Sequence, residues 1–268
     1  MDSEQSPKES ALMTYAEYEK IHDEKPYLFQ LESGGNRLFY FGENHSFDPD
    51  DQQWKAVKSF WQEFLKKTEG RNRIAFVEGG ERPLSSSEKE SIEKNGGMGL
   101  LTYLAHQEGI ETYSPEPSER KERAELEKQF SREQIQYYYF AQMAYQWERK
   151  QDPKPDFDTY MRRALKSDER QSGWSDFDFS LERMRQVHIQ LFGTPFDPGK
   201  KNFWNKIVNP AMRPTVLNGV ARASSRYRDE HIVNEIVKYM KDGHSIFAEY
   251  GGTHVVMQEP LLRALLKA

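Results

Sequence analysis

The residues of this chain best suited to chemistry are acids and histidines that directly follow short apolar segments. Glu43 and His45 follow one such segment, Glu78 follows a second, and His254 follows a third. An imidazole can act as a general base for water while a carboxylate orients it. Two imidazoles and a carboxylate can also hold a divalent metal ion. These residue types predict hydrolytic chemistry, with or without a metal.

The elements that must position these residues alternate between strand and helix up to residue 117. Strand-like runs at 27–31 and 37–41 flank a turn-forming stretch, which predicts a hairpin. The expected elements that follow are a helix opened by Asp50 and Asp51, a strand at 74–77, a helix at 99–107 and a strand at 110–114. This alternation predicts a mostly parallel sheet covered by helices.

Helical patterns dominate the middle of the chain. Helices are expected at 120–151, 158–170 and 180–192, before a proline-rich return over 193–214. A long helix at 220–241, a strand at 245–250 and a terminal helix at 261–266 then complete the core.

We therefore expect an α/β fold, with a mostly parallel central sheet, an N-terminal hairpin, flanking helices and a helical insertion. The insertion spans about 118–213 within a single domain over 13–268, and residues 1–12 form a disordered leader.

The strand ends predict where a site would form. In open parallel sheets the ligand crevice lies at the carboxyl ends of the strands, and glycine lets the backbone turn sharply there. If the three strands are parallel neighbours, Glu43, His45, Glu78 and His254 converge on one crevice. Each residue alone is more often a loop or capping residue. The repetition at three strand ends favours a functional crevice as the alternative to that interpretation.

Three further residues join the candidates. Glu116 follows the strand at 110–114 on the same edge, as a candidate substrate-binding residue or an exposed acid in a rigid turn. Arg228, in the helix at 220–241, is a candidate for stabilising an oxyanion, although most charged helical residues are merely solvated. Asp229 beside it is a candidate for substrate binding.

Composition excludes several classes of protein. The net charge of −5 argues against nucleic-acid binding, and no apolar run approaches the ~18–20 residues needed to span a bilayer. The polar N-terminus has no apolar core of a secretory signal, and zero cysteines exclude thiol catalysis. We expect a cytoplasmic protein with a small-molecule or peptide substrate and no nucleic-acid or membrane partner. The oligomeric state is not given by these features.

Four short motifs, in this order, resemble the superfamily of erythromycin esterases, haem-binding ChaN lipoproteins and TraB/TIKI proteins. They are Gly-Glu-Asn-His at 42–45, Val-Glu-Gly-Gly at 77–80, Arg-Asp at 228–229 and Gly-Gly-Thr-His at 251–254. The resemblance covers about 27–117 and 214–266. It implies an α/β core with a helical insert and a strand-edge site of two histidines, a glutamate and an arginine.

The branches of this superfamily imply different activities. Resemblance to the esterases implies that His45, with Glu43 beside it, activates water to cleave an ester, lactone or amide. Resemblance to the TIKI proteins implies a metal-dependent protease, with manganese, cobalt or zinc held by His45, Glu78 and His254. Resemblance to ChaN implies a non-catalytic protein that binds haem or another small ligand. We take the hydrolase, with water activated by His45 or by a metal, as the leading hypothesis.

Overall fold

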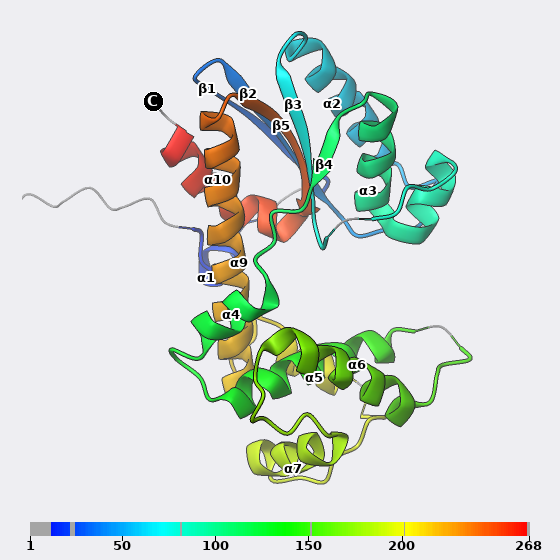
Figure 1. Ribbon diagram of the computed structural model, residues 1–268, viewed down its shortest axis with the longest axis vertical. Helices are drawn as coiled ribbons and strands as arrows, with labels where there is room; N and C mark the ends of the chain where they lie inside the picture. Colours follow the sequence, from blue (N-terminus) through cyan, green and yellow to red (C-terminus); the bar gives the residue numbers. More distant parts are fainter. Residues whose placement is uncertain (1–11, 22–24, 81, 151, 201, 267–268) are drawn as a thin grey trace, which may run out of the picture. The chain divides into compact units, whose positions relative to one another are not determined.

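The computed structural model describes residues 12–21, 25–80, 82–150, 152–200 and 202–266 (Figure 1). The chain divides into two compact units. The sheet unit contains Met1–Glu116 and Asp229–Ala268, and the helical unit contains Pro117–Arg228. The leader predicted at 1–12 lies outside the described residues, apart from Leu12, which is buried.

One five-stranded sheet in the order β1-β2-β5-β3-β4 forms the centre of the sheet unit. The strands are β1 (Tyr27–Ser33), β2 (Asn36–Glu43), β3 (Asn72–Val77), β4 (Glu111–Tyr113) and β5 (His244–Gly251). β1 and β2 form an antiparallel hairpin, and the other three pairings are parallel. The predicted α/β fold, with a mostly parallel sheet and an N-terminal hairpin, is confirmed.

Helices cover both faces of this sheet (Figure 1). They are α1 (Tyr15–Tyr18), α2 (Gln53–Lys67), α3 (Glu88–Gln107), the C-terminal half of α9 (Val216–Lys241) and α10 (Gly252–Leu266). α2 and α3 pack on one face, where Trp61 meets Phe247 with ring centroids 5.1 Å apart. α9 and α10 pack on the other face. The central strands β2 and β5 are buried almost throughout, as expected for strands covered on both faces.

Two helices of the sheet unit start earlier than the sequence predicts. α10 begins at Gly252, not at 261, because Val255 and Val256 bury their side chains in the core. α3 begins at Glu88, not at 99, and passes through a kink at Gly96. Gly96 has φ of 59° and ψ of −141°, a conformation that glycine adopts readily. The glycine-rich segment therefore bends the helix instead of preceding it.

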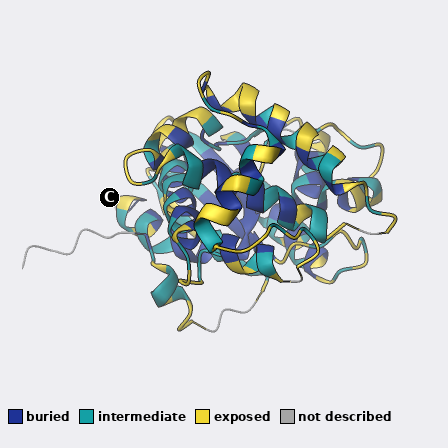
Figure 2. Ribbon diagram, turned by 90° about the horizontal axis from the view of Figure 1, so that it is seen from below, coloured by how far each residue is buried: buried dark blue, intermediate teal, exposed yellow. Residues whose placement is uncertain are grey.

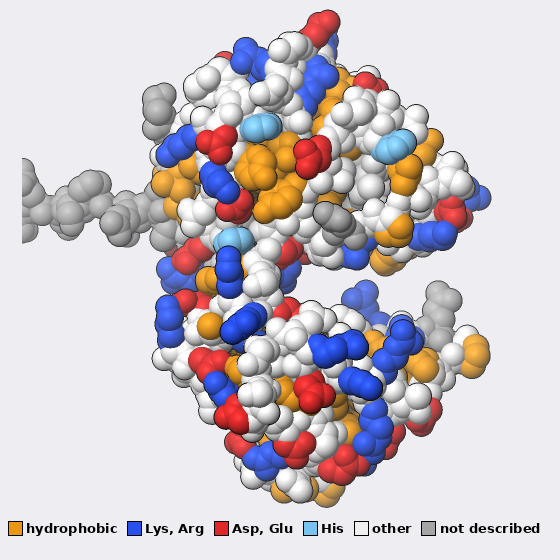
Figure 3. Space-filling view, viewed as in Figure 1, with side chains coloured by type: hydrophobic (Ala, Val, Ile, Leu, Met, Phe, Trp, Pro, Cys, Tyr) orange, Lys and Arg blue, Asp and Glu red, His pale blue; other side chains and the backbone are white. Residues whose placement is uncertain are grey.

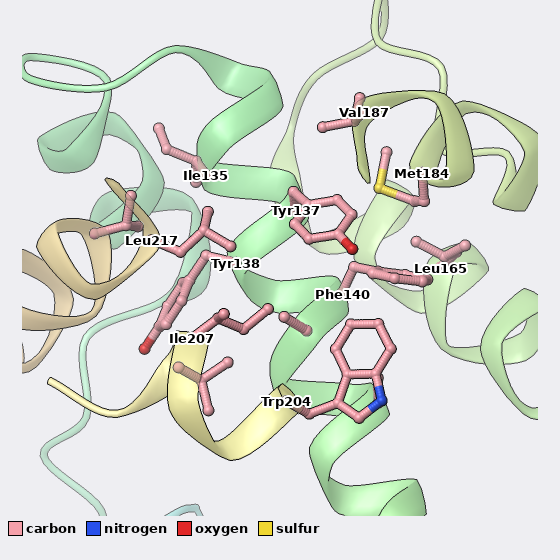
Figure 4. Close-up of a cluster of buried hydrophobic side chains, with 14 of the residues drawn as sticks. Ile135, Tyr137, Tyr138, Phe140, Leu165, Met184, Val187, Trp204, Ile207 and Leu217 are labelled. Atoms are coloured by element: carbon pink, nitrogen blue, oxygen red, sulfur yellow. The ribbon is translucent and has the colours of Figure 1, made fainter. Parts of the chain in front are cut away.

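The helical unit is built around an aromatic core, which includes Tyr137, Phe140 and Trp204 (Figure 4). Its helices are α4 (Glu119–Leu126), α5 (Arg132–Glu148), α6 (Phe157–Ser172), α7 (Leu181–Phe192), α8 (Phe203–Val208) and the N-terminal half of α9. Each longer helix has a buried side and an exposed side (Figure 2). The prediction of one helix at 120–151 is wrong, because Ser131 caps α5 through a capping box and separates it from α4.

Arg123 is the largest charged side chain buried in the helical unit. Its Nη1 donates to Gln136 Oε1 at 2.8 Å, and Gln136 Nε2 donates to Asp168 Oδ2 at 2.7 Å. The guanidinium lies over the ring of Tyr139, 4.0 Å from its centroid. This polar network joins α4, α5 and α6 inside the aromatic core.

Outside these cores, acidic and basic side chains are interspersed over the visible face of each unit (Figure 3). None of the helices within the described ranges combines the length and the apolar character that crossing a membrane requires.

Candidate functional site

The carboxyl ends of β2, β5 and β3 lie side by side and form one edge of the sheet. In the strand register Glu43 is level with Gly251, and Val77 is level with Glu249. Glu78 follows Val77 directly, and its Oε2 accepts a hydrogen bond from the Gly251 backbone N–H at 2.7 Å. The parallel pairing thus brings two of the predicted acids to the same strand end.

His45 is paired with Glu43. Its Nδ1 lies 2.5 Å from Glu43 Oε1. Because an ionised carboxylate only accepts hydrogen bonds, Nδ1 carries the proton and Nε2 of the neutral ring keeps a lone pair. Glu43 is buried, whereas 58% of the His45 side chain is exposed. The carboxylate holds the ring from inside, and Nε2 lies beside the backbone of Gly251.

The charges around His45 favour its protonated form. The hydrogen bond from Glu43 raises the pKa of His45 above its ordinary value, against the opposing effect of burial. The negative charge of Glu78 raises this pKa further, and His254 lowers it. Glu78 and His254 are therefore both close enough to His45 to affect its titration.

His254 lies in the first turn of α10 and has its own buried acid. Its Nδ1 lies 2.7 Å from Asp229 Oδ1, an oxygen that also accepts from Gln258 Nε2 at 2.7 Å. Gln258 Oε1 in turn accepts from the Tyr40 hydroxyl at 2.6 Å. Asp229, Gln258 and Tyr40 are all fully buried. This chain of hydrogen bonds fixes the tautomer and direction of His254.

Two glycines allow β2 and α10 to approach each other. A Cβ on Gly42 would lie 2.9 Å from the Cα of Gly252, a distance that real Cβ atoms do not tolerate. A Cβ on Gly251 would likewise lie 2.9 Å from His45 Nε2. Gly42 thus permits the close approach of β2 and α10, and Gly251 leaves the space in which the imidazole of His45 sits.

A second acid lies behind Glu43. Glu249, on β5, is 1% exposed. A Cβ on Gly97 would lie 2.3 Å from Glu43 Oε2 and 2.5 Å from Glu249 Oε1, so both oxygens converge above this glycine. The Gly97 backbone N–H donates to Glu43 Oε2 at 3.1 Å. Gly97 directly follows the kink of α3, where a new helical segment begins. The backbone N–H groups at the start of a helical segment favour a nearby negative charge.

The donor chemistry of the site suits a divalent metal only in part. Both histidines have a carboxylate at Nδ1, the arrangement that commonly supports a metal-binding Nε2. Over the ranges that the structure describes, however, no three His, Asp or Glu side chains are grouped so that they could hold a metal ion. The predicted ligand set of His45, Glu78 and His254 stays a prediction.

The remaining candidates differ in their relation to the strand edge. Glu116 is half-buried, and its charge contributes to raising the pKa of Tyr40, so it lies near the edge. Asp229 is buried and bonded to His254, which suits an orienting role better than the substrate contact we predicted. Arg228 is the last residue of the helical unit, and its predicted role at an oxyanion stays a prediction.

Four participating residues have no signal in the sequence that identifies them. Tyr40 and Glu249 lie inside apolar strands, and Gln258 lies inside an apolar helix. Gly97 is one of several neighbouring glycines. Of the four, only Glu249 could have been noticed, as a charge inside the apolar run Ile246-Phe247-Ala248-Glu249-Tyr250.

Comparison of the chain with protein-family models, with curated proteins and with solved structures gave no match. The class of the protein therefore follows from its own geometry: an α/β protein with two carboxylate-paired histidines at the carboxyl edge of a mostly parallel sheet.

Proposed function

We propose that this chain is a hydrolase in which His45 activates water to cleave an ester, lactone or amide. The pairing of His45 with Glu43 carries the proposal. It leaves a lone pair on Nε2 of a side chain that is 58% exposed, beside a second oriented imidazole. A general base needs this combination of a fixed tautomer, access to water and a carboxylate that stabilises the charged ring.

The reaction proceeds by addition and elimination. His45 Nε2 accepts a proton as the water oxygen attacks the carbonyl carbon. Glu43 stabilises the imidazolium that forms. The C–O or C–N bond of the tetrahedral intermediate then breaks, and His45 Nε2 returns its proton to the leaving group. His254, oriented by Asp229, donates a hydrogen bond to the developing oxyanion when its own Nε2 is protonated.

The direct test is His45→Ala, assayed against a panel of esters, lactones and amides. Loss of a general base is expected to lower kcat by about 10²–10⁴-fold. His106→Ala is the matched control, because His106 is an exposed histidine of the same unit, on α3. Circular dichroism and thermal unfolding check that both variants keep the fold. Full activity in His45→Ala contradicts the proposal.

Two further measurements separate the alternatives implied by the family resemblance. Elemental analysis of protein purified without chelator, followed by assays with and without EDTA, identifies a metal-dependent protease. Titration with haem, followed by its Soret absorption, identifies a binding protein that turns over no substrate. The hydrolase proposed here keeps its activity in EDTA and gives no Soret shift.

A further inference from the structure

Glu249 is an acid buried in the central strand of the sheet. It is 1% exposed, and neither carboxyl oxygen has a hydrogen-bond partner among the described residues. An ionised carboxylate in such surroundings is strongly disfavoured. Glu249 lies on β5 next to the end of β2, so we relate the free-energy cost of burying its carboxyl group to the candidate site and not to the packing of the core.

The nearest charged neighbour of Glu249 is Glu43. One oxygen of each carboxyl group lies within 2.5 Å of a single point, the position that a Cβ on Gly97 would occupy. Glu43 Oε2 and Glu249 Oε1 are therefore within about 5 Å of each other in a buried place, where ionisation of both groups is strongly disfavoured and one of them is expected to hold a proton.

The surroundings decide which of the two acids holds that proton. Glu43 has His45 at one oxygen and the Gly97 N–H at the other, and both contacts stabilise a negative charge. Glu249 has neither kind of contact. Burial raises the pKa of Glu249 well above its ordinary value, and the charges of Glu43 on β2 and Glu78 beyond β3 raise it further. From α3, the backbone N–H of Gly97 reaches Glu43 Oε2.

We propose that Glu249 is a positioning residue, a neutral carboxylic acid that hydrogen-bonds through its proton to Glu43 and so holds the carboxylate that orients His45. The proton of Glu249 occupies the side of Glu43 turned away from the histidine. This leaves Glu43 Oε1 as acceptor for Nδ1 and keeps the lone pair of the neutral His45 ring on Nε2. The role in catalysis rests on the proposed function, but the protonation state does not.

The protonation state is measured first, on the whole protein. The protein is labelled with ¹³C at the glutamate carboxyl carbons, and the Glu249 signal is assigned by its disappearance in Glu249→Gln. The signal is expected to keep the chemical shift of a protonated acid through neutral pH. A Glu249 signal that titrates together with exposed glutamates such as Glu111 would overturn the proposal, whether or not the protein is a hydrolase.

Kinetics of two variants then test the positioning role. Glu249→Gln keeps a neutral side chain that donates a hydrogen bond, so kcat is expected within about 3-fold of wild type. Glu249→Leu removes the donor and is expected to lower kcat by about 10-fold or more with little change in KM. Glu111→Gln, on the exposed part of β4, is the matched control. An equal loss of kcat in Glu249→Gln and Glu249→Leu would overturn the proposal. Such a result would mean that a neutral hydrogen-bond donor at this position is not sufficient.

The stability of Glu249→Gln provides a readout that does not need activity. A group with a raised pKa in the folded state destabilises the fold as pH rises from its unfolded pKa toward its folded pKa. The glutamine does not ionise, so the variant is expected to gain stability relative to wild type between pH 5 and pH 9, as measured by urea unfolding. A constant difference over this range would overturn the inference. If the carboxyl signal and the stability behave as expected but no substrate is cleaved, the hydrolase proposal fails alone.

Discussion

His45 and His254 are each held by a buried carboxylate at Nδ1, yet they differ in exposure. The His45 side chain is 58% exposed and the His254 side chain 22%. The more exposed imidazole is better placed to exchange protons with water. The less exposed one lies at the end of a hydrogen-bonded chain that restricts its movement. The same pair of residue types thus suits the two proposed roles, general base and stabilisation of the oxyanion, because their surroundings differ.

The pH dependence of activity follows from the pairing of His45 with Glu43. The base works only when neutral, and Glu43 raises the pKa of His45. Activity is therefore expected to fall as pH drops through a value above 6.5, the ordinary pKa of histidine. In Glu43→Gln the acid limb of the kcat profile should move to lower pH. The maximal kcat should fall by at most about 10-fold, because the tautomer of His45 is less well fixed. The profile of Glu93→Gln, an exposed acid of α3, should be unchanged.

A shift of the acid limb to higher pH in Glu43→Gln, or no shift at all, would contradict this assignment of the base.

Asp229 is expected to act through His254. Asp229→Asn retains the volume but loses the charge that accepts from both His254 and Gln258. We expect unfolding free energy to drop by about 1–3 kcal/mol, as for a buried group that loses a hydrogen-bonding partner. We also expect kcat to fall more than KM rises. Urea unfolding and steady-state kinetics check the two effects, and wild-type values in both would refute the role given to Asp229.

At the scale of elements, the kink in α3 is what allows a helix to contribute to the strand edge. Gly96 turns the helix, and the N–H of Gly97 then reaches Glu43. A straight helix would have bonded this N–H within its own backbone. The kink therefore converts an ordinary covering helix into part of the site.

The close approach of α3 predicts that Gly97 tolerates no side chain. In Gly97→Ala the new Cβ would overlap Glu43 and Glu249. We expect a loss of about 1–3 kcal/mol in stability, the usual effect of overpacking, together with a large loss of kcat. Gly219→Ala on α9 is the control, since its Cβ would make only an ordinary 3.5 Å contact with Phe130. A Gly97→Ala variant as stable and active as this control would refute the packing described.

At the scale of the whole molecule, each unit has its own core. The sheet unit is stabilised by the two faces of its sheet, and the helical unit by its aromatic cluster. The polar network around Arg123 lies wholly in the helical unit. Stability should therefore respond to substitutions unit by unit.

Arg123→Met tests this separation, because it leaves Asp168 buried without the guanidinium, whose Nη2 lies 3.5 Å from Asp168 Oδ2. The loss of one member of a buried ion pair is expected to cost about 3–5 kcal/mol. Hydrogen exchange should rise mainly in residues 117–228, and the sheet unit should keep its protection. The control is Arg163→Met, an exposed arginine of α6. Equal loss of protection across β2 and β5 would contradict the independence of the two cores.

Local patterns were enough to predict most elements and the edge at which the site lies. The apolar runs identified the strands, and their alternation with helices identified the parallel sheet. The starts of α3 and α10 were missed because glycines predict the ends of helices. In the structure α3 continues through the kink at Gly96, and α10 begins at Gly252 itself. The candidates Glu43, His45, Glu78 and His254 were found because each lies at the end of a strand or within three residues after it.

The sequence alone therefore determined the fold class and the strand-end candidates Glu43, His45, Glu78 and His254, since both follow from neighbouring residues. Only the tertiary structure decided how these residues are held. Glu249 meets Glu43 across a strand pairing, and Tyr40 reaches Gln258 across 218 residues. Such contacts depend on strand order and helix packing, which bring distant side chains together through the burial of the whole core. No local spacing encodes them.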